Sequence, residues 1–363
     1  MSATKLSINE FLDQAGVFPV IDVRSPGEYK HAHIPNAYSL PLFTDEERKV
    51  VGTAYKQESR ATAIKHGLDF FGPKMKRMIE EVEKILETRQ DNNKTILVHC
   101  WRGGMRSGAV AWLLDLYGFK VYTLEGGYKA FRNWVLLQFE KEYPLRILGG
   151  YTGSGKTEVL SSLKEKGELV IDLEALANHK GSAFGGIGQG EQPSPEMFEN
   201  SLAVQLYNAQ TSIEQIRKSD LQSRSIWLED ESQRIGNINI PITFWKTMRS
   251  KEIVFLDVPF EERLENIIKG YGKADKEKLV NAVIRVKKRL GGAETKAAIN
   301  YLLEDDLKEA FRILLCYYDK WYSKGLHSRE NLNELITEIK SDKTDAELNT
   351  QLVLNYKRKE QNV

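Results

Sequence analysis

The string GYTGSGKT, residues 150 to 157, constrains the fold of this chain more than any other stretch. It matches the pattern G-x-x-x-x-G-K-[ST], and it lies between the strand-like LRIL and the helical EVLSSLKEKG. In this strand–loop–helix context, backbone N–H groups at a helix N-terminus enclose a diphosphate. We therefore predict a diphosphate-binding loop formed by Gly150, Gly153, Ser154, Gly155, Lys156 and Thr157.

Two side chains of this loop carry specific chemistry. Lys156 neutralises the outer phosphate oxygens, and the Thr157 hydroxyl is a ligand for a magnesium ion. Acidic residues that end candidate strands are the predicted magnesium partners: Asp172, Glu229 and Asp230. The motif recognises a diphosphate whichever group is attached to it, so the motif alone does not define a reaction.

A second loop, HCWRGGMRS at residues 99 to 107, places a cysteine between an apolar strand and a helical stretch. Backbone N–H groups of the turn and of the helix N-terminus then face the sulfur, which favours the thiolate. Arg102 and Arg106 add positive charge, and a guanidinium matches a tetrahedral oxyanion. We predict Cys100, Arg102 and Arg106 as catalytic residues. Cys316, in an aromatic-rich helical stretch, is predicted to be a buried apolar residue.

Apolar runs alternate with helical stretches, which predicts parallel sheets in an α/β fold. In the first part the predicted strands are 17–24, 37–42, 94–100 and 120–127, and in the second part 168–173, 225–230 and 252–258. The chain turns helical after Pro259, including a basic segment at 285–289. We predict a first domain over 1–140, a second over 141–340, and a frayed polar tail over 341–363.

Composition restricts the class of protein only broadly. The 363 residues carry 52 basic and 51 acidic side chains, so the chain is not strongly basic. No apolar run approaches the roughly 20 residues that span a bilayer, and the N-terminal segment has no secretory pattern. Two cysteines and six histidines show no metal-ligand spacing. We expect a cytoplasmic protein without a membrane partner.

Three segments resemble the signature segments of a rhodanese domain: IDVRSPGEYKHAHIPNA (21–37), HCWRGGMRSG (99–108) and GFKVYTLEGGYKAF (118–131). The resemblance covers about residues 5 to 137. It implies a loop cysteine that carries a persulfide, and a structural role for Asp22 and Arg24. Five residues separate Cys100 from Arg106, one more than in many sulfur-transferring rhodaneses, and this is also the spacing of cysteine phosphatases. The longer loop favours a tetrahedral, phosphate-like or selenophosphate-like donor.

The segment VFLDVPFEERLENI (254–267) resembles the late strand and helix of small P-loop kinases, with RVKKR (285–289) at the position of their basic lid. A rhodanese domain followed by such a P-loop domain resembles the bacterial tRNA 2-selenouridine synthase family. Three further segments are similar to that family: ERKVVGTAYKQESR (47–60), IDLEALANHKGSAFGG (171–186) and LEDESQRIGNINIP (228–241).

The resemblance implies a two-step reaction on wobble 2-thiouridine (U34) of tRNAs for lysine, glutamate and glutamine. Geranyl diphosphate first alkylates the sulfur, and selenium from selenophosphate then replaces the S-geranyl group to give 2-selenouridine. The P-loop would hold the prenyl diphosphate, and Cys100 would carry selenium as a Cys–S–Se species. Selenophosphate synthetase is an expected partner, and no permanently bound cofactor is expected. Predicted tRNA contacts are Arg48, Lys56, Arg60, His179, Lys180, Arg234, Arg285, Lys287, Lys288 and Arg289.

Two other classes of function remain open at this point. A cysteine phosphatase fused to a small-molecule kinase would also use the Cys-x5-Arg spacing and the P-loop. A binding module with two degenerate anion-sensing loops is the third class, and intact Cys100, Lys156 and Thr157 argue against it. Among the aromatic residues, Tyr151 is a candidate wall for a geranyl slot, whereas Trp227 is predicted to pack in the core.

Overall fold

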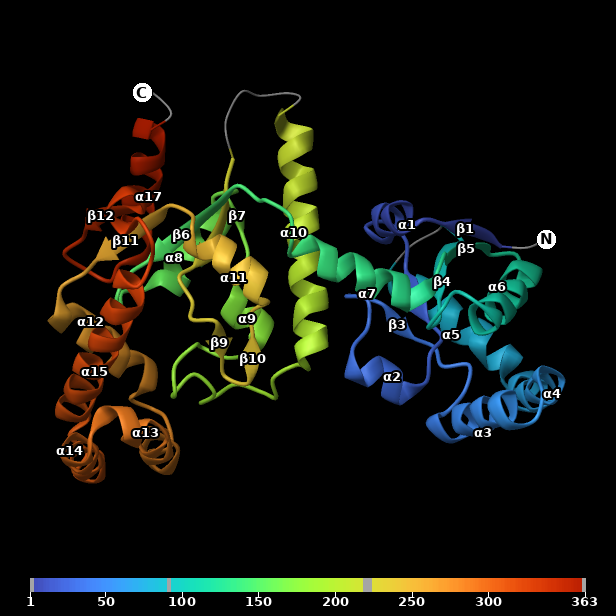
Figure 1. Cartoon of the computed structure of the whole chain (residues 1–363), viewed down its shortest axis with the longest axis horizontal. Helices are drawn as coiled ribbons and strands as arrows, with labels where there is room; N and C mark the ends of the chain where they lie inside the picture. Colours follow the sequence, from blue (N-terminus) through green and yellow to red (C-terminus); the bar gives the residue numbers. More distant parts are fainter. Residues whose placement is uncertain (1–2, 90–92, 218–223, 361–363) are drawn as a thin grey trace. The chain divides into compact units, whose positions relative to one another are not determined.

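The computed structural model describes residues 3–89, 93–217 and 224–360. It contains two compact units, Met1–Gln138 with Glu199–Val204, and Phe139–Phe198 with Gln205–Val363 (Figure 1). The division after Gln138 lies two residues before the boundary expected at residue 140. The sequence did not predict that a segment of a later helix belongs to the first unit.

Unit 1 is built on a five-stranded parallel sheet with the strand order β1-β5-β4-β2-β3. In that order the strands are Thr4–Leu6, Lys120–Leu124, Thr95–His99, Val20–Asp22 and Tyr38–Ser39. Every residue of β4 is buried, as expected for a central parallel strand covered on both faces. The helices are α1 (Ile8–Ala15), α2 (Pro26–His31), α3 (Asp45–Gln57), α4 (Arg60–Phe71), α5 (Met75–Thr88), α6 (Met105–Tyr117) and α7 (Gly127–Gln138).

Unit 2 contains a second five-stranded parallel sheet, with the order β12-β11-β6-β8-β7. These strands are Ile336–Lys340, Ile253–Asp257, Leu145–Gly149, Ile226–Glu229 and Leu169–Val170. The carboxyl ends of β6 and β8 meet at one edge, which is where open α/β sheets bind ligands. A short hairpin, β9 (Arg234–Ile235) and β10 (Ile238–Asn239), follows β8.

The remaining helices include the one after the glycine-rich loop, the helix α10 that belongs in part to unit 1, and a long C-terminal series. They are α8 (Lys156–Glu165), α9 (Leu173–Ala177), α10 (Pro195–Arg217), α11 (Ile242–Arg249), α12 (Phe260–Tyr271), α13 (Lys276–Leu290), α14 (Gly292–Leu303), α15 (Leu307–His327), α16 (Leu332–Leu335) and α17 (Ala346–Glu360). The predicted α/β class, with a helical C-terminal part, is confirmed. None of the described helices has both the length and the apolar character needed to cross a membrane.

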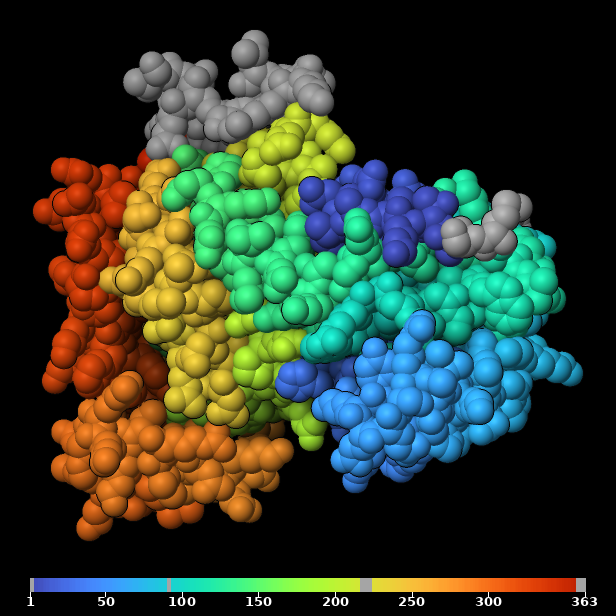
Figure 2. Space-filling view, turned by 45° about the vertical axis from the view of Figure 1, so that its right-hand side comes forward, coloured from blue at the N-terminus to red at the C-terminus, as the bar shows by residue number. Residues whose placement is uncertain are grey.

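The C-terminal helices have a core of their own. Phe184, Leu264, Leu279, Phe311 and Leu315 are buried together in it. In Figures 1 and 2 the helices α13 and α14, coloured orange, lie at one end of unit 2. The basic segment 285–289 lies within the helix α13, and its likeness to the basic lid of small P-loop kinases stays a prediction.

The prediction of a frayed polar tail over 341–363 is wrong for residues 341–360, and residues 361–363 lie outside the described part of the chain. Residues Ala346–Glu360 form α17, which packs on α8, and Val353 is fully buried with Leu148, Val159 and Leu160. The edge strand β12, just before it, pairs with β11. The segment looks polar because only one helical turn of apolar residues contacts the core, too few to dominate its composition.

Val353→Ala is expected to lower the free energy of unfolding of unit 2 by about 2 kcal/mol, because two buried methyl groups are lost and a cavity remains. Denaturant unfolding of the full chain measures this change. Asn355→Ala, at an exposed position of the same helix, is the matched control and should have almost no effect. Equal midpoints for the two variants would contradict the packing of α17.

The prediction that Cys316 is buried is also wrong, because its thiol is exposed on α15. Phe311, Leu314 and Leu315 occupy the buried face of that helix, and the 3.6-residue period turns position 316 outward. Trp227, by contrast, is fully buried in the core around β6, as predicted.

Candidate active-site loops

The cysteine loop is seated directly on the turn between β5 and α7. A Cβ atom at Gly127 would lie 2.4 Å from both the Cys100 carbonyl oxygen and the Gly103 nitrogen, and Gly103 and Gly127 both have a positive φ. Only glycine fits this approach of two backbones. The Tyr128 N–H then donates to the Cys100 carbonyl at 2.8 Å. The GGYKAF segment therefore fixes the position of the loop.

Several donors surround the Cys100 sulfur, which is only 3% exposed. The Ser107 hydroxyl lies 3.2 Å from Sγ. Burial by itself raises the pKa of the Cys100 thiol, but hydrogen bonds from the Ser107 hydroxyl and from backbone N–H groups of Ser107, Gly104 and Arg102 outweigh it, and the pKa is lowered. The predicted backbone cradle is present. Sequence reasoning missed Ser107, although it directly follows Arg106 in the motif.

The two loop arginines are placed differently. Arg102 contributes its backbone N–H to the sulfur, and its side chain is exposed. Arg106 Nη1 donates to Glu28 Oε2 at 2.8 Å, and Arg48 Nε lies 2.9 Å from the same oxygen. Burial raises the pKa of Glu28, but the Arg106 and Arg48 guanidinium groups and the Ser25 donors lower it to about 2. Glu28 is therefore ionised at neutral pH and holds Arg106 at the loop.

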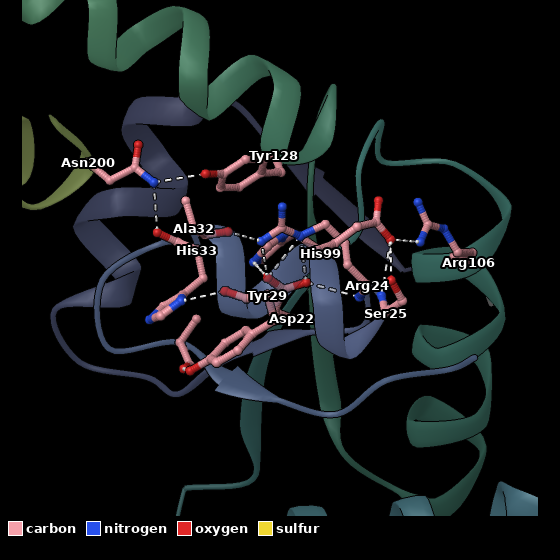
Figure 3. Close-up of polar contacts among 12 residues, drawn as sticks. Asp22, Arg24, Ser25, Tyr29, Ala32, His33, His99, Arg106, Tyr128 and Asn200 are labelled. Carbon is pink, nitrogen blue, oxygen red and sulfur yellow. Dashed lines mark hydrogen bonds and ion pairs between the residues drawn. The ribbon is translucent and has the colours of Figure 1, made fainter. Parts of the chain in front are cut away.

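A buried network braces the same end of the sheet, as Figure 3 shows. Arg24 Nη2 donates to Asp22 Oδ2 at 2.6 Å and to the Ala32 carbonyl at 2.7 Å. The Arg24 guanidinium also lies 3.7 Å from the centroid of the Tyr128 ring. His99, next to the catalytic candidate, is buried beside Asp22, and burial lowers its pKa. Asp22 and Arg24 are thus placed as the predicted structural pair.

Asn200 of α10 is a member of unit 1 and is fully buried there. Its Nδ2 donates to the Tyr128 hydroxyl at 2.8 Å and to the His33 carbonyl at 2.9 Å (Figure 3). Asn200 therefore supports Tyr128, whose backbone holds the cysteine loop. No local pattern around residue 200 distinguishes this asparagine from a surface residue of a helix.

The glycine-rich loop of unit 2 has the backbone that a diphosphate site requires. Gly150, Gly153 and Gly155 have φ values of 148°, 84° and 81°, and a Cβ at Gly153 would approach the Arg263 carbonyl oxygen to 2.7 Å. Gly155 caps α8 without a side-chain hydrogen bond, so the first N–H groups of the helix have no cap competing for them. Ser154 is fully buried and supplies backbone to the loop.

Lys156 and Thr157 converge on one acidic residue. Lys156 Nζ lies 3.4 Å from Glu229 Oε1 and donates to the Gly150 carbonyl at 2.8 Å. Thr157 Oγ1 donates to Glu229 Oε2 at 3.2 Å. Glu229 ends β8 and is in register with Leu148 of β6. This register places the Glu229 carboxylate beside the loop that follows β6, where Lys156 and Thr157 lie. Of the predicted magnesium partners, Glu229 is the one that the structure brings to Thr157.

The other two acidic candidates have different partners. Asp230 accepts from the Tyr322 hydroxyl at 2.7 Å with one oxygen, and its other oxygen forms an ion pair with Arg329. The prediction for Asp230 is therefore corrected, because neighbouring residues at a strand end point in opposite directions. Asp172 caps α9, accepting from the Ala175 N–H at 2.9 Å. Its charge still acts on Glu229.

Two acidic residues near the loop were missed. Glu174, Glu229 and Glu231 each offer a carboxylate oxygen, and these oxygens lie within 4.8 Å of one another. Burial and the charge of Glu229 raise the pKa of Glu174 to about 8. Burial and the charges of Glu229 and Glu174 raise the pKa of Glu231. Carboxylates held this close suit a divalent cation. Side chains alternate in direction along a strand, so Glu231 is expected on the same side as Glu229, and this pattern could have identified Glu231 from the sequence.

The kinase-like segment 254–267 holds the glycine-rich loop from outside. Arg263 Nη1 donates to the Thr152 carbonyl at 3.0 Å, and the same guanidinium pairs with both oxygens of Asp319. Asn266 Nδ2 donates to the Gly153 carbonyl at 3.0 Å, and the Gly150 N–H donates to the Tyr322 hydroxyl. These contacts engage the carbonyls of Thr152 and Gly153 and the N–H of Gly150, and so hold the loop in its conformation.

The predicted tRNA contacts occur in both units. In unit 1, Arg48 and Lys56 lie on α3 and Arg60 begins α4. In unit 2 the remaining residues lie on two elements and one loop: Arg234 on β9, Arg285, Lys287, Lys288 and Arg289 on α13, and His179 and Lys180 in the loop after α9. Arg48 is tied to the cysteine loop through Glu28, and Arg289 lies over the Trp321 ring. Contact of these residues with tRNA stays a prediction.

Comparison with known proteins gives the same two parts. A model of the rhodanese-like domain matches residues 6–133, and a model described as the tRNA 2-selenouridine synthase AAA domain matches residues 143–351. The N-terminal domain of a putative ATP/GTP binding protein from Clostridium difficile 630 is 40% identical over 37% of this chain and 99% of its own length, with a TM-score of 0.33.

Fold and loops together define a rhodanese-like unit joined to a P-loop unit. A tRNA 2-selenouridine synthase from Sulfurovum sp. (strain NBC37-1) is 36% identical over 314 residues, covering 80% of each chain. The same enzyme from Shewanella denitrificans is 33% identical over 345 residues, covering 86% of this chain and 89% of the relative. The chain belongs to the tRNA 2-selenouridine synthase family.

Proposed function

We propose that this chain converts wobble 2-thiouridine of tRNA into 2-selenouridine. The observation that carries the proposal is that one chain holds both intact reactive loops, a thiol with a lowered pKa at Cys100 and a P-loop with Lys156, Thr157 and Glu229 assembled. Similarity to the family over most of the chain supports it. A degenerate binding module would not retain these side chains in this geometry.

The first step takes place at the P-loop of unit 2. The sulfur of 2-thiouridine attacks the terminal carbon of geranyl diphosphate, the carbon–oxygen bond to diphosphate breaks, and the base loses its N3 proton. Loop N–H groups and Lys156 bind the departing diphosphate, whose charge develops as the bond breaks. Thr157, Glu229 and the neighbouring Glu174 and Glu231 would hold magnesium, which supplies further charge neutralisation when bound.

The second step takes place at the cysteine loop of unit 1. The S-geranyl group makes sulfur a leaving group, so a selenium nucleophile adds at C2 of the base and geranylthiol departs. Selenophosphate supplies the selenium. Cys100 is the nucleophile that acts on this donor, and Arg106, oriented by Glu28, binds its phosphate oxygens. Arg102 contributes through its backbone N–H and through its exposed charge.

The tRNA substrates proposed are those for lysine, glutamate and glutamine, and selenophosphate synthetase is the proposed source of the donor. Exposed basic residues on α3, α4 and α13 would bind the phosphates of the tRNA backbone. Binding that depends on such contacts weakens as salt is added, which filter binding at two ionic strengths measures.

Nucleoside mass spectrometry tests the function directly. The purified chain is incubated with tRNA that carries 2-thiouridine under four conditions: no donor, geranyl diphosphate, selenophosphate, and both donors. We expect S-geranyl-2-thiouridine with the first donor, and 2-selenouridine only when both donors are present. Unchanged 2-thiouridine in all four conditions would overturn the proposal. Hydrolysis of an aryl phosphate that Cys100→Ser abolishes would then favour the phosphatase–kinase alternative.

Glu28→Gln is expected to slow the selenophosphate-dependent step about tenfold, because Arg106 loses the carboxylate that orients it. The measurement is kcat/KM for selenophosphate with tRNA that has already been geranylated. Ser25→Ala is the matched control, since it removes the α2 capping partner of Glu28 and keeps the contact with Arg106. An equal loss in both variants would show that Glu28 acts only as a helix cap.

A further inference from the structure

We infer that Cys100 accepts the phosphoryl group of selenophosphate and not its selenium, so that the covalent intermediate is S-phosphocysteine and selenium leaves as hydrogen selenide. The inference rests on the proposed function and concerns its second step. It replaces the expected Cys–S–Se species. Electron balance, the donors around the sulfur and the position of Ser107 support it.

Electron balance excludes simple selenium transfer to a thiolate. In selenophosphate, selenium is already in its selenide state and phosphorus is fully oxidised. Forming a Cys–S–Se bond would oxidise sulfur and selenium by two electrons, so phosphorus would have to leave as phosphite or an external oxidant would be needed. Attack of the Cys100 thiolate on phosphorus needs neither, since one phosphorus–selenium bond breaks while one phosphorus–sulfur bond forms.

The donors around Cys100 suit a phosphoryl group. Backbone N–H groups of Arg102, Gly104 and Ser107 converge on the sulfur, and Gly104 caps α6 with no side chain that competes for the helix N-terminus. Arg106 is held at the loop by a single Nη1 contact with Glu28, and a guanidinium has five N–H donors in all. A phosphoryl group presents three charged oxygens to such donors, whereas a selenium adduct presents one atom.

Ser107 provides the means to release the phosphoryl group. Its hydroxyl donates to the Gly104 carbonyl at 3.2 Å and lies 3.2 Å from the Cys100 sulfur. Once the sulfur carries negative charge it is an acceptor only and the stronger of the two acceptors. The single hydroxyl proton then turns from the Gly104 carbonyl to the sulfur. That hydrogen bond stabilises the thiolate as a leaving group when water attacks phosphorus. Phosphate departs, and Cys100 is restored for the next turnover.

The selenium is transferred to the base in a separate step, which needs no oxidant or reductant. Hydrogen selenide attacks C2 of the geranylated base, a carbon–selenium bond forms, and the carbon–sulfur bond breaks. Geranylthiolate leaves and takes up one proton of hydrogen selenide, and the other proton returns to N3 of the base. Neither half of the reaction changes an oxidation state, and the products are 2-selenouridine, geranylthiol and phosphate.

The experiment measures whether the phosphoryl group of selenophosphate is transferred to Cys100. The full chain is mixed with selenophosphate carrying ¹⁸O on phosphorus, with and without geranylated tRNA, and quenched over time in alkaline denaturant for peptide mass spectrometry. We expect the ¹⁸O-labelled phosphoryl group on the Cys100 peptide, without the isotope pattern of selenium. In Ser107→Ala its hydrolysis should be about tenfold slower, since one hydrogen bond to the leaving thiolate is lost. The exposed Cys316 is the internal control and should stay unlabelled.

The outcomes separate this inference from the function on which it rests. A selenium isotope pattern on Cys100 without ¹⁸O would overturn the inference, as would 2-selenouridine formation with no adduct on Cys100 at any time in either protein. Both results leave the synthase function standing. Failure of the wild-type chain to form 2-selenouridine from geranylated tRNA and selenophosphate would instead remove the proposed function.

Discussion

Cys100→Ala is expected to abolish 2-selenouridine formation, with a loss on the order of a thousandfold or more, because the nucleophile is removed from an otherwise intact loop. Geranylation of the same tRNA should continue, since the diphosphate loop belongs to the other unit. The measurement is the rate of each step by nucleoside mass spectrometry, with geranylated tRNA supplied for the second. The variant should therefore stop at S-geranyl-2-thiouridine when both donors are present.

Its matched control is Cys316→Ala, which removes the exposed thiol of α15 and should leave both steps unchanged. The pH dependence provides a second check. Because the pKa of the Cys100 thiol is lowered, the thiolate persists below the ordinary pKa of cysteine near 8.5, and the rate should fall only at a lower pH. Selenouridine formation by Cys100→Ala at even a tenth of the wild-type rate would contradict a nucleophilic role.

The elements on which the two loops depend were predictable from local sequence. The apolar runs before Cys100 and Gly150 form β4 and β6, and the helices after them begin at Met105 and Lys156. Each loop follows a buried strand and precedes a helix, so the backbone N–H groups were predictable together with the motif. Local sequence patterns are sufficient to predict such a strand–loop–helix segment, because all its parts are adjacent in the chain.

What local patterns did not reveal were contacts between distant residues. Arg106 pairs with Glu28, 78 residues earlier in the chain, and Glu28 also binds Arg48 of a different helix. Asn200 supports Tyr128 from 72 residues away. The packing of α17 on α8 is of the same kind, since Val353 is buried against Leu148 of β6 and Val159 of α8, about 200 residues earlier in the chain. These contacts depend on the tertiary fold, which no local period encodes.

The acidic residues of unit 2 show an intermediate case. The end of β8 was predicted to within one residue, so Glu229 and Asp230 were both named, but the directions of their side chains were not separated. The end of β7 was placed three residues too late, and Asp172 caps a helix there. In the structure Glu229 faces Thr157, and Asp230 faces Tyr322 and Arg329. The two-residue period of a strand would have grouped Glu229 with Glu231 and set Asp230 aside. Glu174, on the short helix α9, required the fold itself.

The second large effect is expected at Lys156. Lys156→Met should lower the rate of geranylation a hundredfold or more, on the order of the loss when a single charge-stabilising donor is removed from an active site. The lysine is only about a tenth exposed, and its ammonium lies between the loop carbonyl of Gly150 and the Glu229 carboxylate. Without it, the departing diphosphate loses the ammonium group that stands beside the three clustered carboxylates. The measurement is S-geranyl-2-thiouridine formed from geranyl diphosphate.

A loss of charge balance in the folded state must be separated from a loss of diphosphate binding. Lys156→Met leaves Glu229 buried without its cation, which by itself costs stability. Adding Glu229→Gln removes that uncompensated charge, so the double variant should regain thermal stability and remain inactive in geranylation. Lys166→Ala, which breaks an ion pair at the end of α8, is the control and should retain activity. Every variant should still convert geranylated tRNA with selenophosphate, since that step uses Cys100. Geranylation at the wild-type rate by Lys156→Met would show that the prenyl diphosphate binds elsewhere.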